Sequence, residues 1–278
     1  MGLTYKPKVR IPSGSEVARL GRMLRQQQLH TVCEEARCPN MHECWSKGTA
    51  TIMILGDNCT RNCSFCNISN SPPDAPDTEE PQRVAATVLN LKLKHVVITS
   101  VTRDDLPDGG AGAFAAVLKA IKDSCPGVTT ELLIPDFQGD LSALELVLNM
   151  KPNVLNHNVE TVPRLYSLVR PQAIFSRSLQ LLKRAAERGH FTKSGMMVGL
   201  GETEAEVREL LDELRTVECR FVTIGQYLQP SRSNLPVDRY VEPEEFDRYK
   251  EYAFEIGFQQ VQSGALVRSS YQAGEFLR

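Results

Sequence analysis

Residues 51–66, Thr-Ile-Met-Ile-Leu-Gly-Asp-Asn-Cys-Thr-Arg-Asn-Cys-Ser-Phe-Cys, join a short apolar run to a group of thiols. The run Thr51–Leu55 ends in a Gly-Asp pair, which is typical of a buried strand that stops at a turn. Cys59, Cys63 and Cys66 lie within eight residues, with no histidine among them. The stretch therefore predicts a strand whose carboxyl end carries three sulfur atoms within reach of one small inorganic group.

Strand-like apolar runs and helical patterns alternate six times between residues 50 and 256. Strict alternation predicts a parallel sheet with helical crossovers, and periodicity alone leaves an open doubly wound sheet and a barrel as alternatives. Six units are fewer than the eight of a complete barrel, and in either architecture catalytic residues are expected at the carboxyl ends of the strands. The predicted strands are Thr51–Leu55, His95–Ser100, Thr129–Ile134, Val154–Val159, Lys193–Leu200 and Phe221–Leu228, with a further short one at Phe258–Ser263. The predicted helices are Glu16–Gln28, Pro81–Leu93, Ala111–Lys122, Leu141–Leu148, Ser176–Arg188, Thr203–Val217 and Pro243–Ile256.

Composition and charge narrow the class of protein. The chain has 278 residues and a formal net charge of −2, so no global basic field indicates a nucleic-acid partner. It has no apolar run of about 18 residues, so we expect no membrane span. The arm Met1–Pro12 is basic and polar without an apolar segment, which argues against a secretory signal peptide. We therefore predict a cytoplasmic protein.

The distribution of cysteines indicates metal binding. Eight cysteines in a reducing compartment are not expected to form disulfides. Six of them fall between Cys33 and Cys66, and such clustering within a large chain is typical of a metal site. Cys125 and Cys219 stand alone and are predicted to be packing residues.

The spacing Cys59-x3-Cys63-x2-Cys66 favours a cubane iron–sulfur cluster with one open iron. A cubane has four irons that each take one outside ligand, and ordinary electron carriers supply four cysteines. This motif supplies three, so one iron is left to bind a substrate or cofactor. Zinc sites usually pair two Cys-x-x-Cys knuckles or add histidines, and a zinc site or plain structural thiols are the alternatives.

A second set of three cysteines, Cys33, Cys38 and Cys44, precedes the first predicted strand in the segment Cys-Glu-Glu-Ala-Arg-Cys-Pro-Asn-Met-His-Glu-Cys-Trp. Its proline and its tight spacing predict a loop wrapped around a ligand rather than a regular helix. His42 lies inside the segment, so a zinc site with three cysteines and one histidine is an alternative to a second cubane.

Three cysteines at the central spacing, after the first strand of an α/β protein, resemble the radical S-adenosylmethionine (SAM) superfamily. The resemblance implies a [4Fe-4S] cluster whose open iron is chelated by SAM and whose electron cleaves SAM to a 5′-deoxyadenosyl radical. It also implies that Phe65 lies near the adenine, although a packing aromatic is the alternative. Gly109 and Gly110 resemble the glycine pair near the methionyl group of SAM, although such a pair is otherwise a turn or a helix start.

The N-terminal cysteine segment followed by the central motif closely resembles the lipoyl synthase family. The resemblance runs from about residue 15 to the end of the chain. Many relatives carry histidine where this chain has Asn234, so no proton-transfer role is assigned there. The other matching stretches are Asn156-His-Asn-Val-Glu-Thr161, Gly225-Gln-Tyr-Leu-Gln-Pro230, Arg239-Tyr-Val-Glu-Pro-Glu-Glu245 and Arg268-Ser-Ser-Tyr271.

This resemblance implies roles for individual residues. In the family, an auxiliary [4Fe-4S] cluster is held by the N-terminal cysteines and a serine of the tail, which implies Ser270 as the fourth ligand. An alkoxide is a hard ligand that can be protonated and leave, which suits a cluster that must be dismantled. We hypothesise that Arg268 and Tyr271 position or gate that serine. The residues predicted to contact SAM are Phe65, Gly109, Gly110, Asn156, Glu160 and Gln226.

The same resemblance implies an α/β fold, a partial (β/α)6 TIM-type barrel at residues 50–257, with a cluster-binding extension at 1–49 and a short extension at 258–278. It implies radical insertion of two sulfur atoms, drawn from the auxiliary cluster, at C6 and C8 of a protein-bound octanoyl-lysine. The implied partners are octanoylated lipoyl-accepting proteins (2-oxoacid dehydrogenase E2 subunits or the glycine cleavage H protein) and an electron donor such as ferredoxin or flavodoxin. The alternatives are a biotin-synthase-like enzyme or methylthiotransferase, an iron–sulfur electron carrier, and a zinc-stabilised binding module.

Overall fold

The computed structural model describes residues 15–35, 38, 40–46 and 51–277. The arm Met1–Pro12 lies outside the described residues. Within the described ranges the chain forms two compact units. None of the helices in these ranges has the length and apolar character that a membrane span needs. The N-terminal unit comprises described residues of 15–61, 68–155 and 272–277, and the C-terminal unit comprises 62–67 and 156–271.

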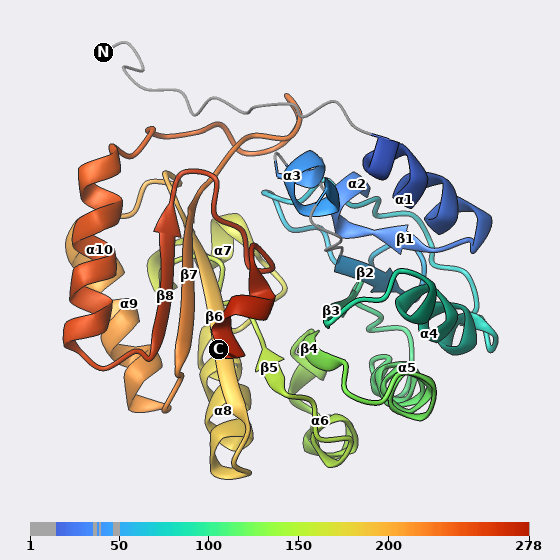
Figure 1. Cartoon of the computed structure of the whole chain (residues 1–278). Coiled ribbons are helices and arrows are strands. Elements are labelled where there is room, and N and C mark those ends of the chain that lie inside the picture. The colour runs from blue at the N-terminus through green and yellow to red at the C-terminus, as the bar shows by residue number, and fades with distance from the viewer. Residues whose placement is uncertain (1–14, 36–37, 39, 47–50, 278) are drawn as a thin grey trace. The chain divides into compact units, whose positions relative to one another are not determined.

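The N-terminal unit contains a sheet accompanied by helices (Figure 1). Strand β1 (His30–Thr31) pairs antiparallel with β2 (Thr51–Ile54), and β2, β3 (His95–Ser100) and β4 (Thr129–Leu133) are parallel neighbours in that order. All of β2 and the centre of β3 are buried, as expected for parallel strands covered on both faces. The helices of this unit are α1 (Ser15–Gln26), α2 (Val32–Glu35), α3 (Met41–Ser46), α4 (Glu80–Asn90), α5 (Ala111–Ser124), α6 (Leu141–Asn149) and the 3-10 turns η1 (Phe137–Gly139) and η3 (Ala273–Leu277).

The C-terminal unit repeats the same construction. Strands β6 (Phe191–Val198), β7 (Phe221–Gln226) and β8 (Gln260–Gly264) are parallel neighbours in that order. Strand β5 (Val154–Asn156) ends where the two units divide, and Glu160 continues its direction as a bridge to Met196. The helices of this unit are η2 (Pro163–Leu165), α7 (Tyr166–Val169), α8 (Phe175–Glu187), α9 (Glu204–Thr216) and α10 (Pro243–Glu255).

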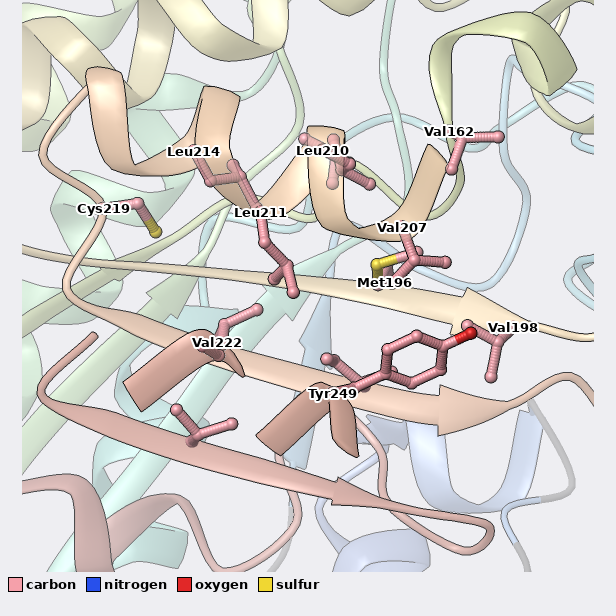
Figure 2. Close-up of a cluster of buried hydrophobic side chains, with 14 of the residues drawn as sticks. Val162, Met196, Val198, Val207, Leu210, Leu211, Leu214, Cys219, Val222 and Tyr249 are labelled. Atoms are coloured by element: carbon pink, nitrogen blue, oxygen red, sulfur yellow. The ribbon is translucent and has the colours of Figure 1, made fainter. Parts of the chain in front are cut away.

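A continuous apolar core lies between the strands and helices of the C-terminal unit (Figure 2). Helix α9 contributes Val207, Leu210, Leu211 and Leu214, whose spacing places them on one face of the helix. They pack with Met196 of β6 and other buried side chains of the same cluster, and all four are 0% exposed. Burial of each such side chain stabilises the fold by about 1.5–3 kcal/mol. The helical period of α9 therefore fixes this helix on the sheet.

The sequence-based elements agree closely with the described structure. Every predicted strand and helix is present, with each end displaced by three residues or fewer. Cys125 and Cys219 are buried packing residues, and burial raises the pKa of the Cys219 thiol to about 12. The loop predicted around the N-terminal cysteines is wrong in part, because α2 and α3 occupy described residues there. Thr31 explains α2, since its hydroxyl accepts the N–H of Glu34 at 3.3 Å and so caps the helix.

The start of α9 is fixed by a capping box and an ion pair. The Thr203 hydroxyl accepts the N–H of Glu206 at 3.3 Å, and the Glu206 carboxylate accepts the N–H of Thr203 at 2.9 Å. Arg164 adds two hydrogen bonds to the same carboxylate, at 2.6 and 2.9 Å. The Arg164 guanidinium and the Thr203 donors lower the pKa of Glu206 to about 2.

We expect the stabilisation by Glu206 to depend on pH. The folded pKa is lowered, so the contribution is fully present above the ordinary carboxyl value of 4.5 and is lost as the pH falls towards about 2. The difference in free energy of unfolding between the native protein and Glu206→Gln should therefore shrink over that interval. Urea unfolding at a series of pH values measures it, with Glu209→Gln on the exposed face of α9 as control. A difference that stays constant down to about pH 2 would contradict the assignment.

Candidate active site

The backbone and the sulfur of Cys59, just after β2, are held by four hydrogen bonds. Its N–H donates to the carbonyl oxygen of Ser69 at 2.8 Å, and its carbonyl accepts Nδ2 of Asn70 at 2.8 Å. Its sulfur accepts the backbone N–H groups of Arg61 and Thr102, at 3.4 and 3.3 Å. Hydrogen bonds to sulfur stabilise a thiolate and tune the potential of an iron–sulfur cluster. The surroundings of Cys59 thus supply two N–H donors to a sulfur that is predicted to hold a cluster.

Arg61 ties the cysteine loop to the ends of two other strands of the N-terminal unit. Its guanidinium donates to Asp104 at 2.7 and 2.9 Å and to Asp136 at 2.6 Å. The side chains of Arg61 and Asp136 are 5% and 0% exposed. Burial opposes the charged form, but the hydrogen bonds to Asp104 and Asp136 raise the pKa of Arg61 above its usual value. Asp105 pairs separately with Arg103 at 2.8 Å, so the two adjacent aspartates neutralise two arginines.

The second half of the cysteine loop, residues 62–67, belongs to the C-terminal unit. The N–H and the hydroxyl of Ser64 donate to two carbonyls of α7, at 3.0 and 2.7 Å. The N–H of Cys66 donates to the carbonyl of Cys63 at 3.0 Å, which closes a tight turn between these two cysteines. Asn234 Nδ2 donates to the Cys66 carbonyl at 2.7 Å. The turn that carries the last two cysteines is thus held by side chains and by main chain of its own unit.

The aromatic residue and the glycine pair predicted near SAM have defined structural surroundings. Phe65 is half-buried and packs against the apolar core of the C-terminal unit. Gly110 has φ +91° and precedes α5, and a Cβ there would lie 2.5 Å from Leu55 Cδ1. Asp108 accepts the N–H of Gly110 at 2.9 Å and holds this turn. Core packing is sufficient reason for an aromatic residue at position 65, and the turn is sufficient reason for glycine at position 110. The contacts of Phe65, Gly109 and Gly110 with SAM stay predictions.

Polar groups gather at the carboxyl end of β5. Asn158 Nδ2 donates to Glu160 at 3.0 Å, and Arg170 donates to the Asn158 carbonyl at 2.7 Å. Burial raises the pKa of the Glu160 carboxyl, and the positive charges of Arg170 and Arg268 oppose that rise. Asn158 Oδ1 and Arg170 Nε are buried without a hydrogen-bond partner among the described residues. This polar group, with Asn156 fully buried beside it in the chain, can receive a polar ligand.

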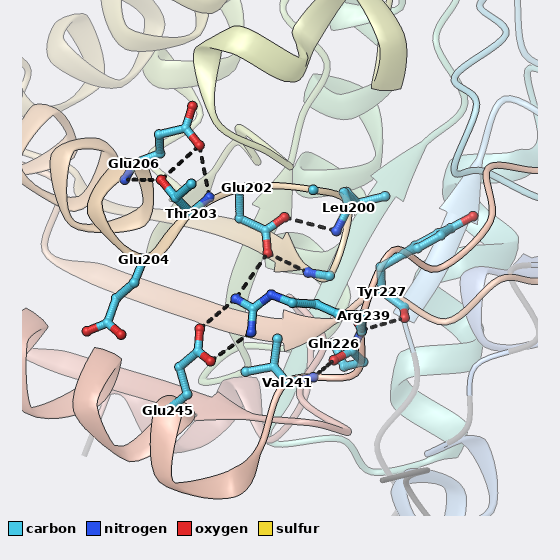
Figure 3. A network of polar contacts seen from close by, with 12 residues as sticks. Leu200, Glu202, Thr203, Glu204, Glu206, Gln226, Tyr227, Arg239, Val241 and Glu245 are labelled. Atoms are coloured by element: carbon cyan, nitrogen blue, oxygen red, sulfur yellow. Dashed lines mark hydrogen bonds and ion pairs between the residues drawn. The ribbon is translucent and has the colours of Figure 1, made fainter. Parts of the chain in front are cut away.

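Gln226, predicted to contact SAM, is fully buried at the end of β7 (Figure 3). Its Nε2 donates to the carbonyls of Tyr227 and Arg239, each at 3.0 Å, and its Oε1 accepts the N–H of Val241 at 2.8 Å. The amide therefore holds the segment that carries Arg239 against the strand. Its contact with SAM stays a prediction.

Arg239 connects two acidic side chains in the same network (Figure 3). It forms a two-pronged pair with Glu245 at 2.7 and 2.6 Å and lies 3.9 Å from Glu202. The Arg239 guanidinium lowers the pKa of Glu245, whereas burial raises the pKa of Glu202. Glu202 also accepts the N–H groups of Gly199 and Leu200, at 2.6 and 2.9 Å. The stretch from Arg239 to Glu245 is thus an internal brace of the C-terminal unit.

The tail residues lie close to β7 in the C-terminal unit. A Cβ on Gly225 would lie 2.1 Å from the Val267 carbonyl oxygen, so only glycine permits this approach. Arg268 Nη1 donates to the same oxygen at 2.6 Å. The N–H of Tyr271 donates to the Arg268 carbonyl at 2.9 Å, which closes a turn that contains half-buried Ser270. The tail is therefore a packed segment rather than a loose end.

The N-terminal cysteines all belong to the N-terminal unit. The N–H of Cys38 donates to the Cys33 carbonyl at 3.0 Å, and Cys44 lies in α3. Burial raises the pKa of the Cys33 thiol to about 11, while the backbone N–H of Thr51 opposes that rise. A bound metal reverses such a shift, because a coordinating thiol is deprotonated outright. None of these three described cysteines forms a disulfide, so their sulfurs stay open to metal ligation.

A separate group of three possible ligands lies on the N-terminal unit. His30, Glu35 and Asp57 have ligand atoms that all lie within 4.8 Å of one another. His30 and Glu35 form an ion pair at 3.5 Å, with each side chain 36% exposed. This pairing accounts for the group without a metal ion.

Comparison with known proteins identifies the class of protein. A family profile described as the radical SAM superfamily matches residues 53–214. The structure of Streptococcus suis SuiB bound to the precursor peptide SuiA aligns with a TM-score of 0.58 at 15% identity, covering 80% of this chain and 50% of that chain. HydG, a maturase of the [FeFe]-hydrogenase, aligns with a TM-score of 0.56 at 16% identity, covering 92% and 63%. These likenesses show the fold alone, and the chain spans about half to three fifths of those structures. The chain is an α/β protein of the radical SAM superfamily, of the partial-barrel type predicted from its sequence.

The family within that class follows from closer relatives. A profile described as the N-terminal domain of lipoyl synthase matches residues 3–38. The lipoyl synthase of Chlorobaculum tepidum is 54% identical over 271 residues, which cover 97% of this chain and 93% of that protein. That of Caldicellulosiruptor saccharolyticus is 53% identical over 277 residues, which cover 98% and 97%. The chain belongs to the lipoyl synthase family of radical SAM enzymes, as its cysteine spacings predict, and the family implies SAM and an iron–sulfur cluster as cofactors.

Several residues of the site were not predicted from the sequence. Arg61, Asn70, Arg170 and Asn234 all hold or adjoin predicted functional residues. Arg61 carries a usable signal in the sequence, because a cation between two predicted ligand cysteines, just after a buried strand, requires a counter-charge. The others act through partners that no local pattern reveals.

We expect Arg61→Met to lower the free energy of unfolding by about 3–5 kcal/mol, because it leaves the fully buried Asp136 without its cation. Equilibrium unfolding in urea measures this loss. The matched control is Arg248→Met, whose partner Glu204 is 36% exposed, so its cost should be much smaller. The double variant Arg61→Met/Asp136→Asn should recover part of the loss. An equal loss of unfolding free energy in Arg61→Met and Arg248→Met would show that the buried pair stabilises the fold no more than the exposed pair.

Proposed function

We propose that the chain inserts two sulfur atoms at C6 and C8 of an octanoyl chain that is amide-linked to a lysine of a lipoyl-accepting protein. When bound, a central [4Fe-4S] cluster supplies the electron that cleaves SAM, and an auxiliary [4Fe-4S] cluster supplies the sulfur. The observation that carries the proposal is the pair of cysteine sets, Cys33/Cys38/Cys44 and Cys59/Cys63/Cys66, in a chain about 54% identical to lipoyl synthases over nearly its full length.

The donor groups around the central set fit a cluster with one open iron. The set offers three half-buried cysteines, and none of these described residues is in a disulfide. The sulfur of Cys59 accepts two backbone N–H groups, as the sulfur ligands of iron–sulfur clusters can. The residues assigned to this cluster are Cys59, Cys63 and Cys66.

We assign the polar group at the end of β5 to SAM. A guanidinium and an amide oxygen with unused hydrogen-bonding atoms, at Arg170 and Asn158, match the carboxylate and ammonium of its methionyl part. Glu160 beside them can accept ribose hydroxyls. This assignment extends the sequence-based contacts at Asn156, Glu160 and Gln226 by two residues.

Ser270 is the proposed fourth ligand of the auxiliary cluster. It lies in the turn closed by Tyr271 and Arg268, so its hydroxyl is carried by a fixed backbone. The Arg268 guanidinium donates to the Val267 carbonyl, and its positive charge lowers the pKa of Glu160 against the effect of burial. Arg268 can therefore orient the turn while Ser270 takes up or releases a proton.

The proposed partners follow from this chemistry. The substrates are octanoylated 2-oxoacid dehydrogenase E2 subunits or the glycine cleavage H protein, and the electron donor is a ferredoxin or flavodoxin. We place the reaction in the cytoplasm, because eight cysteines outside disulfides are typical of a reducing compartment.

The two cysteine sets should separate two steps of the reaction. Cys63→Ala should abolish SAM cleavage, whereas Cys38→Ala should still release 5′-deoxyadenosine but form no sulfur-containing product. Anaerobic turnover with reductant, SAM and an octanoyl-lysyl peptide, read by mass spectrometry, measures both outcomes. Iron and sulfide analysis should give two cubanes for the native protein and one for Cys38→Ala.

Cys125→Ala is the control for this pair, since it removes a buried thiol outside both sets. Lipoyl peptide formed by Cys38→Ala would refute the auxiliary cluster as sulfur source. Zinc in the N-terminal set of the anaerobically purified protein would refute it as well.

Gly225→Ala should uncouple the tail from the reaction. The added methyl group would meet the Val267 carbonyl oxygen at 2.1 Å and push the Ser270 turn away from β7. We expect SAM cleavage to persist while the ratio of sulfur product to 5′-deoxyadenosine falls. The control is Gly264→Ala, whose Cβ would meet Val267 Cγ2 at an ordinary 3.6 Å. An unchanged ratio in Gly225→Ala would mean that the approach of the tail to β7 does not position the serine.

A further inference from the structure

The side chain of Asn234 bridges two main-chain carbonyls of the cysteine loop. Its Nδ2 lies 2.7 Å from the carbonyl oxygen of Cys66 and 3.3 Å from that of Ser64. The next residue, Leu235, donates its N–H to the same Ser64 carbonyl at 3.0 Å. The segment after β7 therefore forms three hydrogen bonds with the turn that carries the last cysteine, and two of them come from the Asn234 amide.

The orientation of this amide is fixed by its partners. A carbonyl oxygen can only accept a hydrogen bond, so the –NH2 group must face Cys66 and Ser64. On the other side, the hydroxyl of Ser231 donates to Asn234 Oδ1 at 2.6 Å. Gln229 Nε2 donates to the Asn234 carbonyl at 2.8 Å and braces the backbone of the loop. The amide is thus held in place before any ligand binds.

We propose that Asn234 is a positioning residue for Cys66. By holding the Cys66 carbonyl, it fixes the backbone from which the third sulfur of the central motif projects. The proposal rests on the proposed function only in taking Cys66 as a cluster ligand. It assigns Asn234 no contact with substrate and no transfer of a proton.

The chemistry of the amide makes the proposal specific. An uncharged –NH2 group offers two hydrogens, which matches two carbonyl acceptors. A carboxylate of the same size offers none and faces both carbonyls with a negative charge. An imidazole offers one hydrogen on a given nitrogen and can serve one of the two carbonyls. Variants at position 234 should therefore rank by the number of hydrogens that the side chain offers to the two carbonyls, and not by the size of the side chain.

Three variants test this order in the full-length, anaerobically reconstituted protein: Asn234→His, Asn234→Ala and Asn234→Asp. The first readout is the rate at which a chelator removes iron from the central cluster. We expect a severalfold increase for Asn234→His, roughly tenfold for Asn234→Ala and roughly thirtyfold or more for Asn234→Asp. The second readout is the SAM-induced change in the electron paramagnetic resonance spectrum of the reduced protein, which should need progressively more SAM in the same order.

Asn90→Ala is the matched control, because it removes the same side chain at an exposed position at the end of α4. It should leave both readouts unchanged, and thermal unfolding should show that all variants fold. If Asn234 only fills space, Asn234→Asp will match the native protein and Asn234→Ala will be worst, which would overturn the proposal. A native protein that shows no SAM-induced spectral change would instead overturn the proposed function and its cluster.

Discussion

A buried arginine between two carboxylates is the constraint on which the N-terminal half of the site depends. Arg61 lies two residues after Cys59, and its cation is bound at once by Asp104 after β3 and Asp136 after β4. Three strand ends of one unit are thereby joined at their carboxyl edge. The N–H of Thr102 reaches the sulfur of Cys59 because this edge is held together. The cost of breaking a buried pair is several times that of an exposed one, so this edge resists distortion.

The C-terminal unit also contains an arginine between two carboxylates, but its ion pairs are more exposed to solvent. Arg239 also lies between two carboxylates, Glu245 and Glu202, but its side chain is 36% exposed where that of Arg61 is 5%. Solvent screens a pair of this exposure, so its ionic contribution is smaller. The fully buried amide of Gln226 adds three hydrogen bonds to main chain, at Tyr227, Arg239 and Val241. The two units hold their strand ends by charge in one case and mainly by amide hydrogen bonds in the other.

The sequence predicts what is local and periodic, and it fails where function depends on distant partners. Buried strands such as β3 are visible as apolar runs, and α9 is visible from its spacing and its capping residues. Helices α2 and α3 are shorter than the window in which helical periodicity can be recognised, so a loop was predicted there. The cysteine sets are evident from spacing, but the partners of Arg61 and Asn234 lie 75 and 168 residues away. No period or motif links such pairs, and packing alone brings them together.

Neutral amide side chains, rather than charged ones, hold the two ends of the cysteine loop, and electrostatics gives a reason for this. Asn70 donates to the carbonyl of Cys59 and Asn234 to that of Cys66, so the first and the last cysteine are each held by a neutral group. The potential of an iron–sulfur cluster depends on nearby charge and on hydrogen bonds to its sulfurs. A lysine or arginine at either position would make reduction easier, and a carboxylate would oppose it. Arg61, inside the loop, is bound by two carboxylates. Neutral amides therefore hold both ends of the loop without adding charge next to the predicted cluster ligands.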